Sequence, residues 1–295
     1  MTITALDRRT WNFPRMLWLD MTRKCQLNCS HCYNSSGPTE EHGTMTRDSW
    51  LALVDQAATV GVEHIQLIGG EPTLHPDAGD VANRALEYGI SVEVYSNLVH
   101  LTDAWWDLLQ RDGMSLATSY YSHCAEKHNR VTMRPSHRHT RANMKKALAL
   151  RIPLRVGVVV EDDGPHVDMI IRDLKSLGVA RIGVDHVRPF GRAAHDQDPD
   201  TSGLCGRCGT GTACIGPDGD VSPCIMSGWL SVGNVQTKPL STILSGPEMA
   251  RATSTIRSAK EPKDPQDPPN PIHKPCDPDH WCKPGTPGSG CPPRR

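Results

Sequence analysis

Short apolar runs alternate with amphipathic stretches between residues 15 and 190. The runs predict buried strands at residues 16–19, 64–68, 90–95, 116–120, 154–160 and 182–187. The stretches between them carry apolar residues at helical spacing, which predicts helices at about 46–61, 77–88, 102–110, 139–150 and 167–177. Thr46 is a suitable N-cap for the first helix, and Gly89 a suitable stop for the second.

Repeated β-α units imply an α/β fold with a parallel sheet and helices outside it. Six such units suit a partial (β/α)6 TIM-like barrel, which we expect to cover residues 12–192. In barrels of this kind the functional groups follow the carboxyl ends of the strands, so those positions are the first to search for chemistry.

The pattern changes after residue 191, where Gly, Pro and Asp dominate. Of the 24 prolines, 11 fall between Pro262 and Pro293. Such a segment is too poor in apolar residues to hold itself together, so it is either disordered or folded by bound metal. Seven cysteines favour metal. We therefore expect a small, irregular cysteine-rich domain over residues 200–295 that folds only with its metal.

The charge balance excludes some classes of protein. Lys and Arg number 32 against 33 acidic residues, which argues against a general binder of nucleic acid or of anionic membranes. No apolar run reaches the ~20 residues of a membrane span, and the first 30 residues lack a signal peptide. The sequence predicts a cytoplasmic protein. A basic stretch at residues 130–146 could attract an acidic peptide or form a solvated helix face.

Eleven cysteines in a reducing compartment indicate metal or redox chemistry, and their odd number disfavours a framework built only of disulfides. Three of them form Cys25-x3-Cys29-x2-Cys32 directly after the first strand. Three thiolates on one loop can hold three irons of a four-iron cluster and leave the fourth iron open to a ligand. The alternative is a zinc site completed by His31 or a distant residue.

The loop after the second predicted strand reads Ile68-Gly69-Gly70-Glu71-Pro72. Together with the cysteine triad it resembles the radical SAM superfamily, whose GGE motif follows the second strand. The resemblance implies that Gly69, Gly70 and Glu71 meet the amino group of the methionyl part of S-adenosylmethionine (SAM). Glycines permit close backbone approach, and a carboxylate suits an ammonium group.

The same resemblance implies further contacts to SAM. Ser96 and Asn97 stand where the family often has Thr-Asn-Gly near the ribose, although Leu98 replaces the glycine. His31 resembles the family's aromatic contact to adenine. Ser119, at the end of the fourth strand, resembles a serine that meets the carboxylate or ribose; its alternative role is a bond to its own backbone.

Two arginines, Arg188 and Arg192, follow the last predicted strand in a turn that resembles a Pro/Phe-Gly-Arg turn of related enzymes. One of them could meet adenosine or the substrate. The alternative is that both are solvated loop residues.

Four C-terminal cysteines form the pattern Cys205-x2-Cys208-x5-Cys214-x9-Cys224. The Pro-Asp-Gly at residues 217–219 predicts a hairpin in which Cys214 and Cys224 face each other. The segment resembles the opening of the SPASM domain, which implies auxiliary iron–sulfur clusters. The last three cysteines, Cys276, Cys282 and Cys291, keep only part of the SPASM closing pattern.

Seven cysteines leave two arrangements open. Two auxiliary [4Fe-4S] clusters share all seven, with one iron open or held by another residue type, or a single cluster has four cysteine ligands. A zinc ribbon is the alternative for residues 205–224.

The resemblance implies that an open iron reductively cleaves SAM and that the resulting 5′-deoxyadenosyl radical abstracts a hydrogen atom. The SPASM-like segment implies modification of a ribosomally synthesised peptide by a crosslink, thioether, epimerisation or oxidation. Expected partners are the peptide and a reductase, flavodoxin or ferredoxin as electron donor. Only about 14 residues precede the barrel, so we expect a leader peptide to be held by a separate leader-binding protein or by the barrel itself.

Two alternatives stay open. One is a radical SAM dehydrogenase or isomerase of a small molecule such as a sugar, and the other is a non-catalytic iron–sulfur or zinc scaffold. The substrate, the bond formed, the fate of SAM and the oligomeric state do not follow from the sequence.

Overall fold

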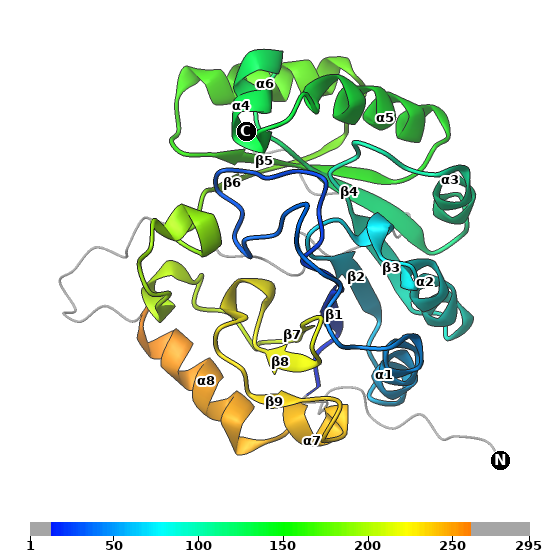
Figure 1. The fold of residues 1–295 in the computed structure, drawn as a ribbon, viewed down its shortest axis with the longest axis vertical. Coiled ribbons are helices and arrows are strands. Elements are labelled where there is room, and N and C mark those ends of the chain that lie inside the picture. The colour runs from blue at the N-terminus through cyan, green and yellow to red at the C-terminus, as the bar shows by residue number, and fades with distance from the viewer. Residues whose placement is uncertain (1–12, 261–295) are drawn as a thin grey trace, which may run out of the picture.

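The computed structural model describes residues 13–260, and its central feature is a sheet of parallel strands (Figure 1). Six strands lie side by side in chain order. They are β1 (Met16–Asp20), β2 (His64–Ile68), β3 (Ser91–Tyr95), β4 (Met114–Tyr120), β5 (Leu154–Val160) and β6 (Arg181–His186). Each lies within two residues of a predicted run, so the prediction of a parallel α/β sheet is confirmed.

Helices cover the outside of this sheet (Figure 1). Five were predicted: α1 (Arg47–Thr59), α2 (Ala78–Glu87), α3 (Asp103–Leu109), α5 (His137–Ala149) and α6 (Pro165–Ser176). Thr46 caps α1 as expected, since its side chain accepts a hydrogen bond from the Ser49 amide. A sixth helix, α4 (Ala125–Thr132), was not predicted, because it buries only His128 and Thr132 and so lacks an apolar stripe.

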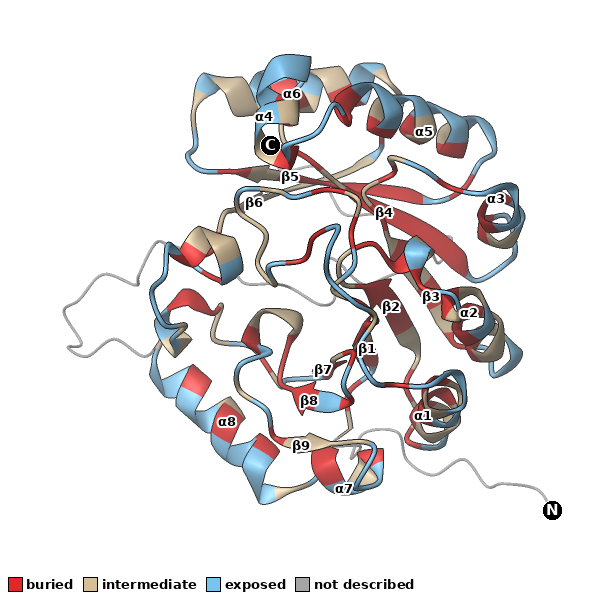
Figure 2. Cartoon of the chain, in the orientation of Figure 1, coloured by how far each residue is buried: buried red, intermediate tan, exposed pale blue. Residues whose placement is uncertain are grey.

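The core lies between the strands and the helices. Strand residues such as Leu17, Leu67 and Leu116 are fully buried, and they pack with helix residues such as Trp50 and Ala85 in one continuous apolar cluster. Figure 2 shows this burial along the strands and on the inner sides of the helices. Burial on both faces explains why β2 and β5 read as apolar runs, whereas β3 alternates between buried and half-buried residues.

The sheet continues beyond the barrel strands into the C-terminal segment. Strand β7 (Thr212–Ile215) pairs in parallel with β1, and β8 (Asp220–Ser222) and β9 (Gly233–Asn234) extend the sheet in antiparallel fashion. The two regions therefore share one sheet, and the domain boundary between residues 192 and 200 stays a proposal.

The predicted hairpin is present, but its register differs from the expectation. Cys214 pairs with Ser222, so the prediction that Cys214 faces Cys224 is wrong. Pro223 ends the strand because it has no amide to donate to the ladder. Cys224 instead precedes a short 3-10 helix, η5 (Ile225–Ser227), where its amide binds the Ser227 hydroxyl at 2.9 Å.

The C-terminal segment also contains apolar helices, which corrects a second expectation. Helices α7 (Leu240–Leu244) and α8 (Pro247–Ser258) place Leu240, Ile243 and Met249 in the main core cluster. This part of the segment is thus not too poor in apolar residues to fold, because it packs into the apolar core of the barrel. Cys276, Cys282 and Cys291 lie outside the described residues. Within residues 13–260, no helix combines the length and apolar character needed to cross a bilayer.

Candidate functional site

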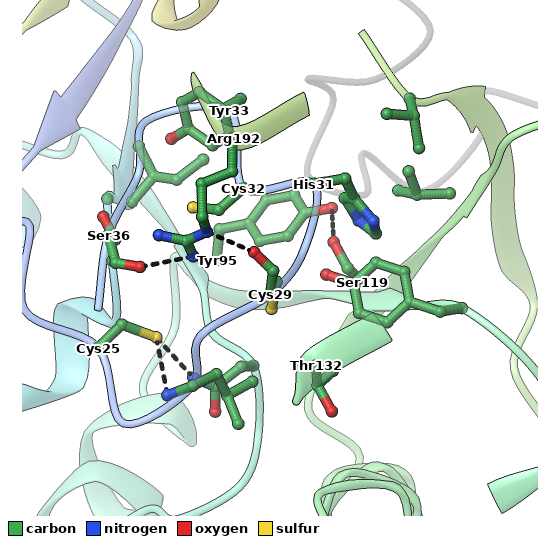
Figure 3. A pocket seen from close by; sticks show the side chains of 18 of the residues that line it. Cys25, Cys29, His31, Cys32, Tyr33, Ser36, Tyr95, Ser119, Thr132 and Arg192 are labelled. Carbon is green, nitrogen blue, oxygen red and sulfur yellow. Dashed lines mark hydrogen bonds between the residues drawn. The ribbon is translucent and has the colours of Figure 1, made fainter. Parts of the chain in front are cut away.

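A cavity of about 180 Å³ opens at the carboxyl ends of the barrel strands (Figure 3). Of the ten site residues predicted in the barrel, nine line it: Cys25, Cys29, Cys32, His31, Gly69, Gly70, Ser96, Asn97 and Ser119. They come from the ends of three strands and from the loop after β1. Residues far apart in the sequence thus meet at the position where barrels hold their functional groups.

The cysteine loop is anchored on two sides by backbone hydrogen bonds. The Cys25 amide donates to the Gly37 carbonyl at 3.0 Å, within the loop itself. On the other side, the amides of Asn28 and Ser30 donate to the carbonyls of Thr132 and Val131 at 3.3 and 2.9 Å. The last turn of α4, the unpredicted helix, therefore supports the loop.

Arg192 fixes the same loop from the far edge of the sheet. Its Nε donates to the Cys29 carbonyl at 2.7 Å and its Nη2 to the Ser36 carbonyl at 2.8 Å (Figure 3). A Cβ on the preceding Gly191, whose φ is +56°, would lie 2.3 Å from the Cys32 carbonyl oxygen. The alternative of a solvated loop residue is therefore wrong for Arg192, which holds the cysteine loop.

Arg188 is also buried, and it pairs with Asp185 at 3.2 Å. Both arginines line the cavity. For Arg188 too, the solvated alternative is wrong.

The thiols lie in polar contact with the strand ends. The Asn97 side-chain amide lies 3.6 Å from Cys25 Sγ, and the Leu27 amide 3.4 Å from the same sulfur. Burial raises the pKa of Cys25 and that of Cys29 to about 12. In the absence of metal both groups are therefore neutral thiols, and a bound cluster must displace their protons.

The donor set fits a four-iron cluster with one open position. Three cysteines line the cavity, and no fourth described cysteine does. Separate thiols around a shared hollow suit a larger cluster.

The two glycines after β2 are required by the close approach of the loop after β1. A Cβ on Gly69 would lie 2.6 Å from the Thr22 carbonyl oxygen, and one on Gly70 would lie 2.3 Å from that of Lys24. Any side chain would therefore push the cysteine loop away, and the bare backbone of both residues faces the cavity.

Glu71 is the one predicted barrel residue that does not line the cavity. It is fully buried, and burial raises the pKa of its carboxyl group. Its Oε1 accepts from the Thr73 amide and hydroxyl at 3.2 and 2.7 Å, and its Oε2 accepts from the Asn97 amide at 2.8 Å. In this arrangement Glu71 holds the end of β3, and its contact with SAM stays a prediction.

Several cavity residues escaped the sequence reasoning. The Tyr95 hydroxyl lies 3.1 Å from the Ser119 hydroxyl, so a partner on another strand replaces the backbone bond considered for Ser119. The Tyr121 and His31 rings pack edge to face, with their centroids 4.9 Å apart. The positions of both tyrosines at strand ends could have marked them as cavity residues. His128 lies on α4, and nothing in its sequence position marked it as a cavity residue.

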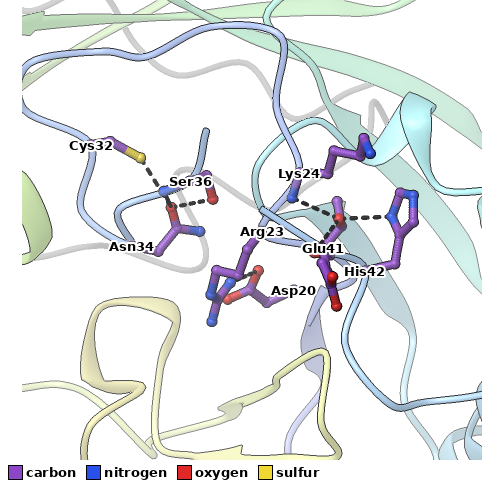
Figure 4. A network of polar contacts seen from close by, with 9 residues as sticks. Asp20, Arg23, Lys24, Cys32, Asn34, Ser36, Glu41 and His42 are labelled. Atoms are coloured by element: carbon purple, nitrogen blue, oxygen red, sulfur yellow. Dashed lines mark hydrogen bonds and ion pairs between the residues drawn. The ribbon is translucent and has the colours of Figure 1, made fainter. Parts of the chain in front are cut away.

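Separate groups of polar contacts lie at the end of β1 and in the cysteine loop (Figure 4). Arg23 pairs with the buried Asp20 at 2.5 Å. Asn34 Oδ1 accepts from the Ser36 hydroxyl at 2.7 Å and lies 3.0 Å from Cys32 Sγ. Asp20, Arg23 and Asn34 also line a hollow together with Met226 and Trp229 of the C-terminal segment.

Three of the four described C-terminal cysteines lie together. The thiol of Cys208 contacts those of Cys205 and Cys224, and these contacts raise the pKa of Cys208. The three pack with Phe190, Leu204 and Ile256 in a second apolar cluster. Cys214 is deeply buried, and burial raises its pKa, with Asp20 also near. Their role as cluster ligands stays a prediction.

Comparison with known proteins agrees with this geometry. The sequence model of the Radical SAM superfamily matches residues 19–174, and that of an iron–sulfur cluster-binding domain, SPASM, matches residues 205–277. The AdoMet-dependent heme synthase of Methanosarcina barkeri is 27% identical over 190 residues, 63% of this chain and 54% of that protein. The PqqA peptide cyclase of Methylobacterium sp. 4-46 is 26% identical over 187 residues, which are 61% of this chain and 48% of that protein.

Solved structures share the fold. Streptococcus suis SuiB bound to S-adenosylmethionine superimposes with a TM-score of 0.69 at 17% identity, covering 84% of this chain and 68% of SuiB. The structure of anSMEcpe with bound AdoMet and Cp18Cys peptide gives 0.65 at 13% identity, covering 82% of each chain. The chain spans about half the length of the two curated relatives named above. On its sequence match and its barrel site, this chain belongs to the radical SAM superfamily.

Proposed function

We propose that this protein is a radical SAM enzyme that modifies a ribosomally synthesised peptide. The observation that carries the proposal is the meeting of three thiols, two bare glycines and three strand-end polar residues around one cavity. Beside it lies a second group of buried cysteines within the SPASM match. A cluster with an open iron would supply the electron that cleaves SAM to a hydrogen-abstracting radical.

The chain's own residues would bind and orient the reactants. Cys25, Cys29 and Cys32 would hold the cluster, and Arg192 would keep their loop in place. The backbone of Gly69 and Gly70 would receive the methionyl end of SAM. The strand-end residues Ser96, Asn97 and Ser119, with His31 across the cavity, would surround its ribose and adenine.

Support for a peptide substrate comes from relatives. One curated relative is a PqqA peptide cyclase, and SuiB, of the same fold, has been solved bound to the precursor peptide SuiA. We propose auxiliary clusters on the C-terminal cysteines, a cytoplasmic location, a separate leader-binding protein and an external electron donor. We also place the domain boundary between residues 192 and 200.

A small-molecule substrate is the second candidate. The AdoMet-dependent heme synthase aligns over a length similar to that of the peptide cyclase, and its name gives a product that is not a peptide. The two candidates differ in what the cavity must admit, and a product assay separates them.

Anaerobic reconstitution tests the proposal. The parent should bind roughly 8–12 irons per chain, and the Cys25→Ala, Cys29→Ala, Cys32→Ala triple variant should bind about four fewer. With dithionite and SAM the parent should release 5′-deoxyadenosine, and the triple variant should not. Mass spectrometry of a co-expressed precursor peptide should show a modified product. A zinc-loaded, iron-free protein with full activity would contradict the proposal.

A further inference from the structure

Helices α4 and α5 and the turn between them are rich in basic residues, of which Arg141 pairs with Asp173 of α6. Residues 121–151 contain eight Lys or Arg and one acidic residue, Glu126, whereas the whole chain has a net charge of -1. Arg130 pairs with Glu126 at 2.9 Å. Within the part of the chain that the structure describes, the exposed Lys127, Arg134 and Arg138 form no ion pair. Their charge is therefore available to a partner.

This surface is attached to the cysteine loop. The carbonyls of Val131 and Thr132 accept the hydrogen bonds of the Ser30 and Asn28 amides described above. Asn28 and Ser30 are exposed, and Cys29 between them is half-buried. Two backbone hydrogen bonds therefore join the basic turn to the residues on either side of Cys29.

An exposed methionine stands between the basic residues. Met133 ends α4 with a φ of +56° and is 58% exposed. Glycine or asparagine usually takes this left-handed position, because a larger side chain makes it costlier. An apolar residue held there and flanked by Arg130 and Arg134 has the form of a small docking site, with an apolar centre and a charged rim.

We propose that this surface docks an acidic, low-potential one-electron carrier protein, which reduces the cluster held by Cys25, Cys29 and Cys32. The inference rests on the proposed function, because SAM cleavage requires an electron from outside the chain. The reduced carrier would give up one electron and become its one-electron-oxidised form, and that electron would pass to the oxidised cluster that Cys25, Cys29 and Cys32 would hold. Such encounters use small interfaces guided by charge, as this surface offers.

The surface suits an electron carrier better than a peptide substrate. A substrate that loses a hydrogen atom must enter the cavity onto which the thiols face. An electron has only to reach the ligands of the cluster, and the basic turn touches their loop from outside. Charge complementarity then selects an acidic carrier and increases the rate of encounter at low salt.

The test uses the reconstituted full-length enzyme and a chemically reduced, acidic flavodoxin. The Arg134→Glu, Arg138→Glu double variant should slow reduction of the cluster in stopped flow by at least about tenfold at low salt, and should weaken flavodoxin binding in calorimetry. Met133→Asn should weaken binding without harming the fold, since asparagine adopts the left-handed conformation readily. Lys238→Glu is a charge-reversal control away from this surface, because Lys238 is exposed between β9 and α7 at the opposite end of the molecule (Figure 1). It should change neither the rate of cluster reduction nor flavodoxin binding.

Dithionite separates this inference from the proposed function, because it reduces the cluster without docking. All variants should release 5′-deoxyadenosine with dithionite at the parent's rate. If flavodoxin reduces and binds the double variant as well as the parent, the inference is wrong. If the variant instead loses only peptide modification in the dithionite assay, the surface serves an acidic peptide, which also overturns it. Loss of dithionite-driven cleavage in the parent itself would count against the proposed function.

Discussion

Glu71 illustrates how a motif residue can act through its neighbours. Its carboxylate accepts three hydrogen bonds, from Thr73 and from the Asn97 amide, while Asn97 also reaches Cys25. The carboxylate thereby links the end of β2 to the end of β3 on the side of the cysteine loop. This arrangement gives Glu71 a positioning role that differs from the direct contact with SAM implied by the resemblance.

Two substitutions at Glu71 separate these roles. Glu71→Gln keeps one oxygen for the Asn97 amide and can donate to the Thr73 hydroxyl, and it loses only the bond from the Thr73 amide. SAM affinity should therefore stay within about threefold. Glu71→Ala leaves buried donors without partners and should cost about 1–3 kcal/mol of stability and about tenfold in SAM affinity. Titration calorimetry with SAM measures the affinity, and urea unfolding measures the stability. Equal, ten- to hundredfold losses of affinity in the two variants would indicate a direct contact between the charge and the SAM ammonium.

The sequence identified residues whose chemistry depends on local spacing, and it missed those that depend on packing. Cys25, Cys29 and Cys32 follow from spacing, and Gly69 and Gly70 from a short motif. Arg192 was left ambiguous, because its partners lie about 160 positions away in the sequence. Glu71 was assigned a contact, but its burial and bonding partners become visible only in three dimensions.

Helix α4 shows the same limit among the elements. It was missed because its buried residues are polar, yet its last turn supports the cysteine loop. His128, its buried histidine, packs against Tyr120 and Tyr121 of the fourth strand region and against His137 of α5. The Tyr121 amide lies 3.5 Å from its Nδ1. Burial lowers the pKa of His128 to about 3.

This histidine should make the iron-free protein sensitive to acid. An unfolded histidine has a pKa of about 6.5, so between pH 6.5 and 3 the unfolded chain binds a proton that the folded protein excludes. This proton does not affect the free energy of unfolding above about pH 6.5. As the pH falls below 6.5, the free energy of unfolding decreases. At pH 5 the loss should be about 2 kcal/mol.

The measurement is urea unfolding of the iron-free protein at pH 7.5 and pH 5. The fall in unfolding free energy between these values should be about 2 kcal/mol smaller in His128→Phe than in the parent. Equal falls in the two proteins would show that His128 does not exclude the proton.

Helices α7 and α8 bear on how the C-terminal segment folds. Ile243 is buried in the same core cluster as the barrel strands, and β7 pairs with β1. Ile243→Ala should therefore destabilise the protein by about 2–5 kcal/mol in one cooperative transition. Thr242→Ala, at an exposed position of the same helix, should have little effect. A separate early transition confined to residues after 200, seen by hydrogen exchange, would refute this coupling.

For the chain as a whole, the sequence predicted the parallel barrel strands closely, because strands such as β2 and β5 are buried apolar runs and helices of clear periodicity separate the strands. It did not predict that β7 would extend the same sheet, because strand order depends on tertiary pairing. It underestimated α7 and α8 because Gly and Pro dominate the overall composition of the segment. The apolar spacing of Leu240, Ile243 and Leu244 was the local signal that this composition obscured.

The two groups of cysteines lie in one fold but in different surroundings, which suggests separate tasks. Cys25, Cys29 and Cys32 line the barrel cavity, whereas Cys224 packs with Cys208 in the second apolar cluster and does not line it. Cys224→Ala should leave the local fold intact, since its amide still binds the Ser227 hydroxyl. The substitution should therefore affect only the auxiliary cluster that we propose for the C-terminal cysteines.

Cys224→Ala should therefore release 5′-deoxyadenosine within about twofold of the parent rate, because the barrel site is untouched, while forming no modified product. Cys25→Ala should lose both, because the cavity thiol is needed to hold the cluster that cleaves SAM. Cys124→Ala, a half-buried thiol that belongs to neither group, is the matched control and should retain both activities. Anaerobic assays of 5′-deoxyadenosine and product, with iron content measured for each variant, make the comparison. If Cys224→Ala abolished SAM cleavage while keeping the barrel cluster, the two groups of cysteines would not act separately, and the continuous sheet through β1 and β7 would be the first place to seek their coupling.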